Sequence, residues 1–312
     1  MTTRSVAAAL SALLLSACVT YPDISQSRSP CQLEPGGWCG FLRDAAVDAF
    51  PYAVASTNAY TGDSDTFARP GRVLQRLEHL PIAPEDADKG FGYEVFNQYE
   101  SGSGSNANRT PVARIIAFRG TDFKGLSDIF YGSLRNDQIE LALRYFAAEK
   151  ARLGSGVPWV VTGHSLGGAL ATEVSVAHPE VRAYMFNTSP FTRSEIRENA
   201  LKRIVFNERG EVLRRFARYD EPPAANVFTL NCEPRKNAIT KHKVRPLADC
   251  ITWIAAYASA DAHEVVKANG IPKPFVECGP DDRAHPGPSS SKGEPCPHNG
   301  LRKSKSGKRS GD

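Results

Sequence analysis

A serine framed by glycines is the first residue whose surroundings point to chemistry. The segment 163–167, Gly-His-Ser-Leu-Gly, fits the pattern Gly-x-Ser-x-Gly. It lies between an apolar stretch at 157–162 and a stretch of small residues at 166–177. In that context the pattern predicts a strand-to-helix turn that lifts the hydroxyl of Ser165 above a sheet, where it can attack an acyl carbon. The glycines are needed because side chains there would clash with the neighbouring strand and helix.

A serine nucleophile needs three kinds of partner, and the sequence contains candidates for them. The charged oxygen of a tetrahedral intermediate needs hydrogen-bond donors, and one is the backbone N–H of the residue after the serine, Leu166. A histidine must take the serine proton, and a carboxylate must orient that histidine. Behind such a turn the chain order is serine, acid, histidine. Both partners are therefore expected after Ser165.

Of the seven histidines, two remain after elimination by position. The five that are unsuitable precede the serine, lie inside its turn, end the following helix or belong to the C-terminal tail: His79, His164, His178, His285 and His298. His242 is flanked by Lys241 and Lys243, which would lower the basicity of an imidazole and are typical of a solvated surface. His263 lies at a loop-to-helix transition and is the predicted base.

A second motif makes the pattern more specific. Residues 118–122 read Phe-Arg-Gly-Thr-Asp, and the serine motif extends to Gly168. With both, the chain resembles the class 3 lipases, the fungal-type triacylglycerol lipase family, over roughly residues 40–270. The resemblance implies an α/β-hydrolase fold, a lipid ester as substrate, and catalysis without a metal or organic cofactor.

The resemblance also assigns roles to particular residues. It implies that Thr121 is the second oxyanion donor and that the catalytic histidine lies near the C-terminal end of the domain, as His263 does. The family's acid follows a strand, here 203–207, and Glu211 before a valine is the best match. Glutamate replaces the usual aspartate, and Glu208 and Asp220 remain alternatives.

The elements around these motifs predict a mostly parallel sheet covered by helices on both faces, because strands alternate with helices along the chain. Strands are expected at 90–99, 112–118, 157–162, 181–187 and 203–207, with a hairpin tip at 101–108. Helices are expected at 41–60, 138–153, 166–177 and 262–268.

The N-terminus predicts export. Residues 1–17 form a signal peptide, since Arg4 precedes an apolar stretch that is too short to span a bilayer. The sequence Leu-Ser-Ala-Cys18 resembles the bacterial lipobox, in which the cysteine becomes the first mature residue and carries acyl chains. Cys18 is therefore the predicted lipid attachment site, and the valine after it favours the outer membrane. An ordinary cleaved signal peptide is the alternative.

The remaining organisation follows from composition. Residues 18–39 are a polar tether, 40–279 the hydrolase domain, and 280–312 a basic tail predicted to be disordered. The formal net charge of +4 is too small for an electrostatic nucleic-acid binder, so no nucleic-acid partner is expected. The partners expected are the lipid ester and, through the anchor, a membrane.

Six cysteines besides Cys18 suggest disulfides in an exported chain. They allow 15 pairings, of which proximity favours 31–39, 232–250 and 278–296. Zinc-binding spacings such as Cys-x-x-Cys are missing, so no metal site is predicted.

The sequence thus predicts a lipid-anchored serine hydrolase that cleaves carboxylic esters of lipids. Acyl transfer to an alcohol would use the same residues, and a non-catalytic envelope lipoprotein with this fold is a rival of another class. Residues 122–132 carry apolar side chains at near-helical spacing and fit either a short lid or the start of the next helix.

Overall fold

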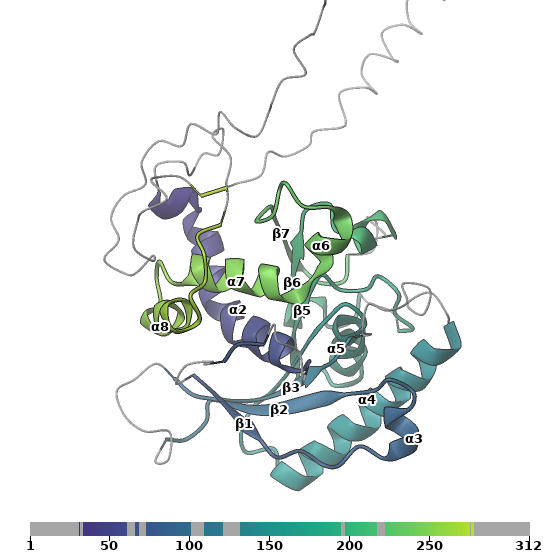
Figure 1. The fold of residues 1–312 in the computed structure, drawn as a ribbon. Helices are drawn as coiled ribbons and strands as arrows, with labels where there is room; N and C mark the ends of the chain where they lie inside the picture. Colours follow the sequence, from purple (N-terminus) through teal and green to yellow (C-terminus); the bar gives the residue numbers. More distant parts are fainter. Residues whose placement is uncertain are drawn as a thin grey trace, which may run out of the picture.

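A seven-stranded sheet forms the centre of the protein (Figure 1). The computed structural model describes residues 31, 34–60, 66–68, 73–100, 109–120, 132–194, 197–216, 222–274 and 276–277. The strands are β1 Leu74–Leu77, β2 Tyr93–Gln98, β3 Ala113–Phe118, β4 Trp159–His164, β5 Arg182–Phe186, β6 Arg203–Glu208 and β7 Asn226–Leu230. They lie in sequential order; β1, β2 and β3 pair antiparallel, and β3 to β7 pair parallel.

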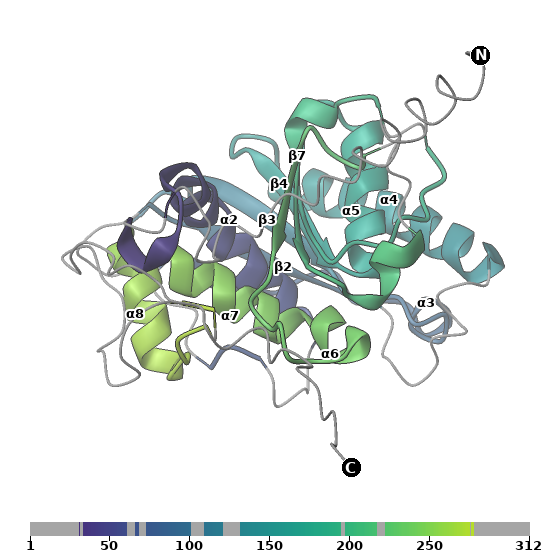
Figure 2. The same cartoon turned by 90° about the horizontal axis from the view of Figure 1, so that it is seen from above.

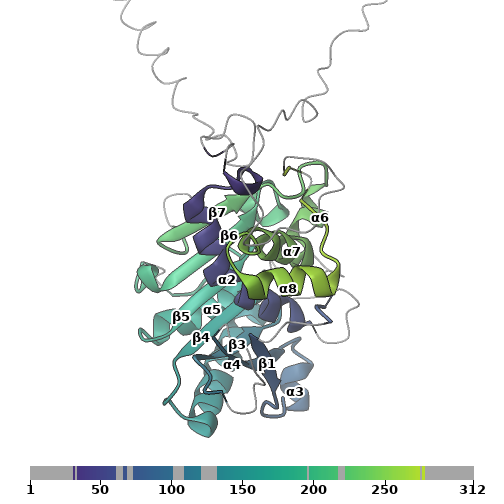
Figure 3. The same cartoon turned by 90° about the vertical axis from the view of Figure 1, so that its left-hand side faces the viewer.

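Helices cover both faces of this sheet (Figures 2 and 3). The crossover helices α4 (Gly132–Leu153) and α5 (Leu166–Ala177) lie on one face. The other face is covered by α2 (Gly40–Asn58), α7 (Val244–Ala255) and α8 (Ala260–Asn269). Shorter elements are η2 Pro35–Gly37, α3 Pro84–Ala87, η5 Ala200–Lys202, η6 Val212–Phe216 and α6 Ala238–His242. The protein has the predicted α/β-hydrolase fold.

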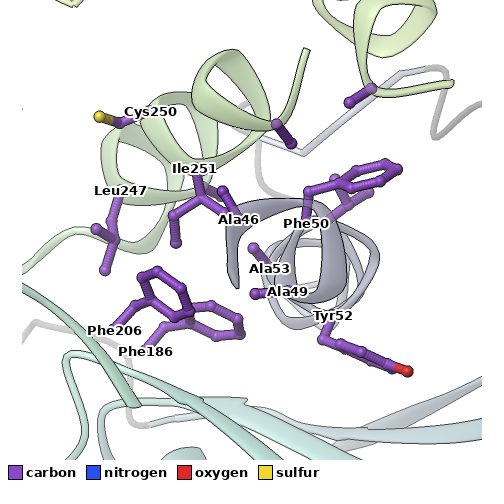
Figure 4. Close-up of a cluster of buried hydrophobic side chains, with 14 of the residues drawn as sticks. Ala46, Ala49, Phe50, Tyr52, Ala53, Phe186, Phe206, Leu247, Cys250 and Ile251 are labelled. Atoms are coloured by element: carbon purple, nitrogen blue, oxygen red, sulfur yellow. The ribbon is translucent and has the colours of Figure 1, made fainter. Parts of the chain in front are cut away.

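Alternation along the strands builds a separate core on each face. In β3, Ile115 belongs to the core under α2 and α7, and the adjacent Ile116 belongs to the core under α4 and α5. On the first face, small residues of α2 such as Ala49 and Ala53 let the helix approach the rings of Phe186 and Phe206 (Figure 4). The two cores fix the sheet between helices, so its carboxyl edge is a rigid base for a site.

The predicted elements are largely confirmed. The antiparallel pairing of the strands predicted at 90–99 and 112–118 is present, with Tyr93 opposite Phe118. Strands β1 and β7 and the helices α6 and α7 were not predicted. Other predictions lie outside the described residues, namely the hairpin tip at 101–108, most of 122–132, the signal peptide with Cys18, and the basic tail.

Two of the expected disulfides are present, Cys31–Cys39 and Cys232–Cys250. The pair 278–296 lies outside the described residues. Within the described ranges no helix is both long and apolar enough to cross a membrane.

Candidate active site

Ser165 occupies the turn between β4 and α5, and its backbone is in the left-handed region with φ 56°. Such a conformation costs a non-glycine residue of order 1–3 kcal/mol. It is held by two backbone hydrogen bonds, from the Ser165 N–H to the Phe186 carbonyl at 3.2 Å and from the Ser189 N–H to the Ser165 carbonyl at 3.0 Å. The turn is therefore fixed by the neighbouring strand β5 and the loop that follows it.

The glycines of the motif are required by packing. A Cβ at Gly167 would lie 2.1 Å from the carbonyl oxygen of Phe118, and one at Gly163 would lie 2.2 Å from the backbone of Gly167. Both distances are far below any real carbon contact, so a side chain at either position would push β3, β4 and α5 apart. The prediction of a strand-to-helix turn at Ser165 is confirmed.

The imidazole that contacts Ser165 belongs to His242, the last residue of α6. Its Nε2 lies 3.0 Å from Ser165 Oγ, and both side chains are fully buried. On its other side, Nδ1 of His242 lies 2.6 Å from Oε2 of Glu211. An ionised carboxylate can only accept, so Nδ1 of His242 donates to Glu211, and Nε2 is the ring nitrogen that faces the serine hydroxyl.

Glu211 lies in the turn that follows β6. Gly210, with φ 76°, reverses the chain, and the carboxylate is then fixed by the backbone N–H of Leu213 at 2.8 Å. Its Oε1 is buried and has no hydrogen-bond partner within the described part of the chain. A buried carboxylate with one oxygen on an imidazole stabilises the positive charge which that imidazole gains when it takes a proton.

The structure brings Ser165 and Glu211 together but places the predicted base, His263, elsewhere. His263 is in α8, which packs on α7 at the end opposite to α6 (Figures 1 and 2). His242 takes its place against Ser165. The prediction that two lysines would place His242 on a solvated surface was wrong, because the three side chains leave the chain in different directions. Lys241 Nζ donates to the Arg209 carbonyl, Lys243 is exposed, and the ring of His242 points inward.

One signal in the sequence could have identified His242. The pairing 232–250, favoured by proximity, closes a loop that contains this histidine and not His263. A covalently closed loop is a better position for a fixed base than a helix further along the chain.

The alternative acids are separated by their contacts. Glu208 receives the backbone N–H groups of Cys232 at 2.9 Å and Glu233 at 3.0 Å, so its carboxylate fixes the start of the loop that carries His242. Asp220 lies outside the described residues. Of Glu208 and Glu211, it is Glu211 that contacts the imidazole.

The two predicted oxyanion donors have different outcomes. Leu166 begins α5, and the N–H groups in the first turn of a helix have no acceptor within it, so they can face a developing negative charge. Thr121 lies outside the described residues. The residue before it, Gly120, packs on the nucleophile turn, since a Cβ there would lie 3.2 Å from Cβ of Ser165.

Taken together, these contacts join a strained serine, a buried imidazole and a buried carboxylate by two hydrogen bonds. Such an arrangement can transfer a proton from a hydroxyl to an imidazole and stabilise the ion pair that results. Among the described residues, histidine, cysteine and acidic side chains do not gather in a group of three that could hold a metal ion.

The chain matches no family model and no curated protein. Among solved structures it is similar to a lipase of Rhizopus microsporus var. chinensis, at 14% identity over 56% of this chain and 70% of that one, with a TM-score of 0.37. It is also similar to lipase II of Rhizopus niveus, at 14% identity over 55% and 74%, TM-score 0.37. A third is the Lip2 lipase of Yarrowia lipolytica, at 12% identity over 59% and 78%, TM-score 0.38.

Proposed function

We propose that this protein is a serine hydrolase that cleaves carboxylic esters of lipids. The observation that carries the proposal is the continuous set of hydrogen bonds from Glu211 through His242 to Ser165, with the serine in a strained turn at the carboxyl edge of the sheet. The order of the three groups, and the way each faces the next, are those that acyl transfer requires.

The proposed reaction has two steps. In the first, Ser165 Oγ bonds to the acyl carbon while His242 Nε2 takes the hydroxyl proton, and the C–O bond of the ester then breaks as His242 returns that proton to the leaving alcohol. In the second, water attacks the acyl-enzyme and passes its proton to His242, and the carboxylic acid leaves as the proton returns to Ser165 Oγ. The Leu166 N–H, and by our proposal Thr121, stabilise the oxyanion in both steps.

Exposed apolar side chains beside the site favour a lipid over a small soluble ester. Phe216 ends η6, which begins just after Glu211, and its side chain is 46% exposed. Ile239 in α6 is 50% exposed, one turn before His242. The ring centroids of Phe191 and Phe216 are 6.3 Å apart. Apolar side chains exposed close to a reactive group are suited to contact with acyl chains.

The test combines a covalent probe with an ester assay on the purified full-length chain. A fluorophosphonate is expected to label Ser165, and p-nitrophenyl esters of graded chain length should be hydrolysed with an optimum beyond acetate. Ser165→Ala and His242→Ala are expected to lower kcat by about 10⁴-fold or more. The matched control is His263→Ala, which should stay within about twofold of the wild type because α8 lies away from the site. Folded protein that neither reacts with the probe nor cleaves any ester would refute the proposal.

We also propose that the mature chain is anchored to the bacterial outer membrane through acylated Cys18. The apolar stretch before it and the Leu-Ser-Ala-Cys sequence support this. Two or more acyl chains would hold the protein stably, since each buried CH₂ contributes roughly 0.8 kcal/mol. Labelled palmitate should be incorporated by the wild type and not by Cys18→Ala, and incorporation that survives the substitution would rule out this anchor.

A further inference from the structure

The histidine before the nucleophile, His164, has both ring nitrogens in hydrogen bonds and is 2% exposed. Its Nδ1 lies 2.9 Å from the hydroxyl of Tyr60, and its Nε2 lies 2.6 Å from the backbone carbonyl of His242. The side chain therefore links the end of α2, the nucleophile turn and the backbone of the proposed base. The mechanism above does not use it.

The contacts fix the positions of the protons. A carbonyl oxygen can only accept, so Nε2 of His164 carries a hydrogen and donates it to His242. Burial, and secondarily the neighbouring ring of His242, hold the pKa of His164 well below its usual value, so the ring is neutral and its Nδ1 is an acceptor. The Tyr60 hydroxyl must then donate to Nδ1, and its oxygen accepts the backbone N–H of Gly120 at 3.1 Å.

The neutral state of His164 also matters for the base. The rings of His164 and His242 have centroids 4.8 Å apart. A positive charge on His164 would oppose the charge that His242 must acquire when it takes the serine proton. A neutral imidazole can hold the backbone of His242 without that electrostatic cost.

A second donor completes the support of His242. Asn187, which follows β5 and has φ 42°, donates through Nδ2 to the same carbonyl at 3.2 Å and to the Lys241 carbonyl at 3.1 Å. Its Oδ1 accepts the N–H of Glu208 at 2.7 Å. The end of α6 is thus fixed from β4 by His164 and from β5 by Asn187.

We propose that Tyr60 and His164 are positioning residues that hold the backbones of His242 and Gly120 in one fixed arrangement around Ser165. The inference rests on the function proposed above, since it assigns His242 as the base. Tyr60 and His164 act on catalysis through the backbones they hold, so their loss should lower turnover and leave substrate binding almost unchanged.

The experiment compares substitutions that differ in a single hydrogen bond. Tyr60→Phe removes the hydroxyl shared by Gly120 and His164. His164→Gln carries an amide N–H near the position of Nε2, whereas His164→Asn does not reach that far. The matched control is Tyr93→Phe, which also removes a buried hydroxyl with two partners, the Leu80 carbonyl and Glu149. Tyr93 lies in β2 and belongs to the core under α4 and α5, on the face of the sheet opposite to α2. kcat and KM are measured for a soluble p-nitrophenyl ester, well below the unfolding temperature of every variant.

We expect kcat to fall about tenfold in Tyr60→Phe and about a hundredfold in His164→Asn, with KM within about twofold. His164→Gln should recover about tenfold over His164→Asn, and Tyr93→Phe should keep the wild-type kcat even where it lowers the unfolding temperature. A Tyr60→Phe variant with the same kcat as Tyr93→Phe would overturn the proposal, as would equal kcat in the two His164 variants.

A second readout does not depend on activity. Nitrogen–proton correlation NMR of the imidazoles should show His164 as the neutral Nε2–H tautomer from pH 5 to pH 8, unchanged by an inhibitor on Ser165. A His164 signal that titrates in this range, or that carries its proton on Nδ1, would also overturn the assignment. If the wild type cleaves no ester and takes no probe, the hydrolase proposal fails, and the NMR result still decides whether the hydrogen-bond arrangement exists.

Discussion

Cys232 and Cys250 are joined by a disulfide across the segment that carries His242. The disulfide links the loop that follows β7 to the middle of α7 at a sequence separation of 18. Glu208 holds the Cys232 end of this segment by accepting two backbone N–H groups. His242 is thus on a short helix with both flanks tied to the core. Such support is what keeps a catalytic side chain within a fraction of an ångström of its working position.

Replacing Cys232 and Cys250 together by alanine is expected to lower both stability and turnover. Closing a loop of about this length is worth roughly 3 kcal/mol in the chain-entropy model. Because His242 lies inside the loop, kcat for a soluble ester should fall about tenfold or more in the folded variant. Urea unfolding and steady-state kinetics measure the two effects.

The control for that variant is the double replacement of Cys31 and Cys39. This disulfide closes a loop with a separation of 8 at the start of α2, away from α6 (Figure 1). The variant should lose stability and keep its kcat. Equal loss of kcat in the two double variants would contradict a local effect on His242.

Glu211→Gln is expected to lower kcat by about 10³ to 10⁴-fold, because an amide can present its NH₂ to Nδ1 and favour the wrong tautomer of His242. Glu211→Asp should also lose activity, since a side chain shorter by one CH₂ no longer reaches the ring at 2.6 Å. Glu208→Gln is the comparison. Glu208→Gln should lower the free energy of unfolding, and its kcat should fall less than that of Glu211→Gln. A larger loss of kcat in Glu208→Gln than in Glu211→Gln would argue against Glu211 as the acid.

Replacing Phe216 and Ile239 together by serine should separate binding to lipid surfaces from chemistry. Each side chain is about half exposed, so together they offer apolar area worth a few kcal/mol to a bilayer or micelle. We expect activity on dispersed phospholipid to fall about tenfold or more, while a soluble acetate ester is hydrolysed within about twofold of the wild-type rate. Leu201→Ser is the matched control, because Leu201 is 84% exposed but precedes the opposite end of β6. A control variant with the same loss would refute a specific surface.

Glu277 gives the stability of the protein a predictable dependence on pH. Its carboxylate accepts hydrogen bonds from Trp38, Trp253 and Tyr257, and burial raises its pKa to about 7 in spite of them. An acid whose pKa is raised on folding favours the folded state below its unfolded pKa, near 4.5, and this contribution is lost as the pH rises through 7.

Glu277→Gln should remove this dependence. Between pH 4.5 and pH 8 the wild type is expected to lose on the order of 3 kcal/mol of unfolding free energy relative to the variant. Urea unfolding at the two pH values measures the difference, and a constant gap between the proteins would contradict the assigned pKa.

The parts of the site that local sequence encodes were predictable. Two glycines and an apolar strand specify the turn at Ser165, and Glu211 follows its strand at a short, fixed distance. His242 was not, because its burial depends on contacts between segments distant in sequence. Residues next to each other on a helix point about 100° apart, so two charged neighbours say little about the residue between them.

The unpredicted strands have a related explanation. β1 and β7 are the edges of the sheet, and both are short and partly exposed. Their residues therefore lack the apolar alternation that identifies a half-buried strand. Pairing with β2 and β6 determines their structure.

The sequential strand order has a consequence for how the chain is made. The crossover helices α4 and α5 cover one face of the sheet as it grows, but the other face is closed by α2 together with α7 and α8, from opposite ends of the sequence. A nascent chain that has emerged only as far as β7 contains every strand of this sheet but not α7 or α8. The side chains that these two helices cover in the folded protein, including Phe186 and Phe206, are then still partly bare. Folding can therefore finish only after the last helices have been synthesised, and until then this apolar face must be kept from other chains by its cellular surroundings.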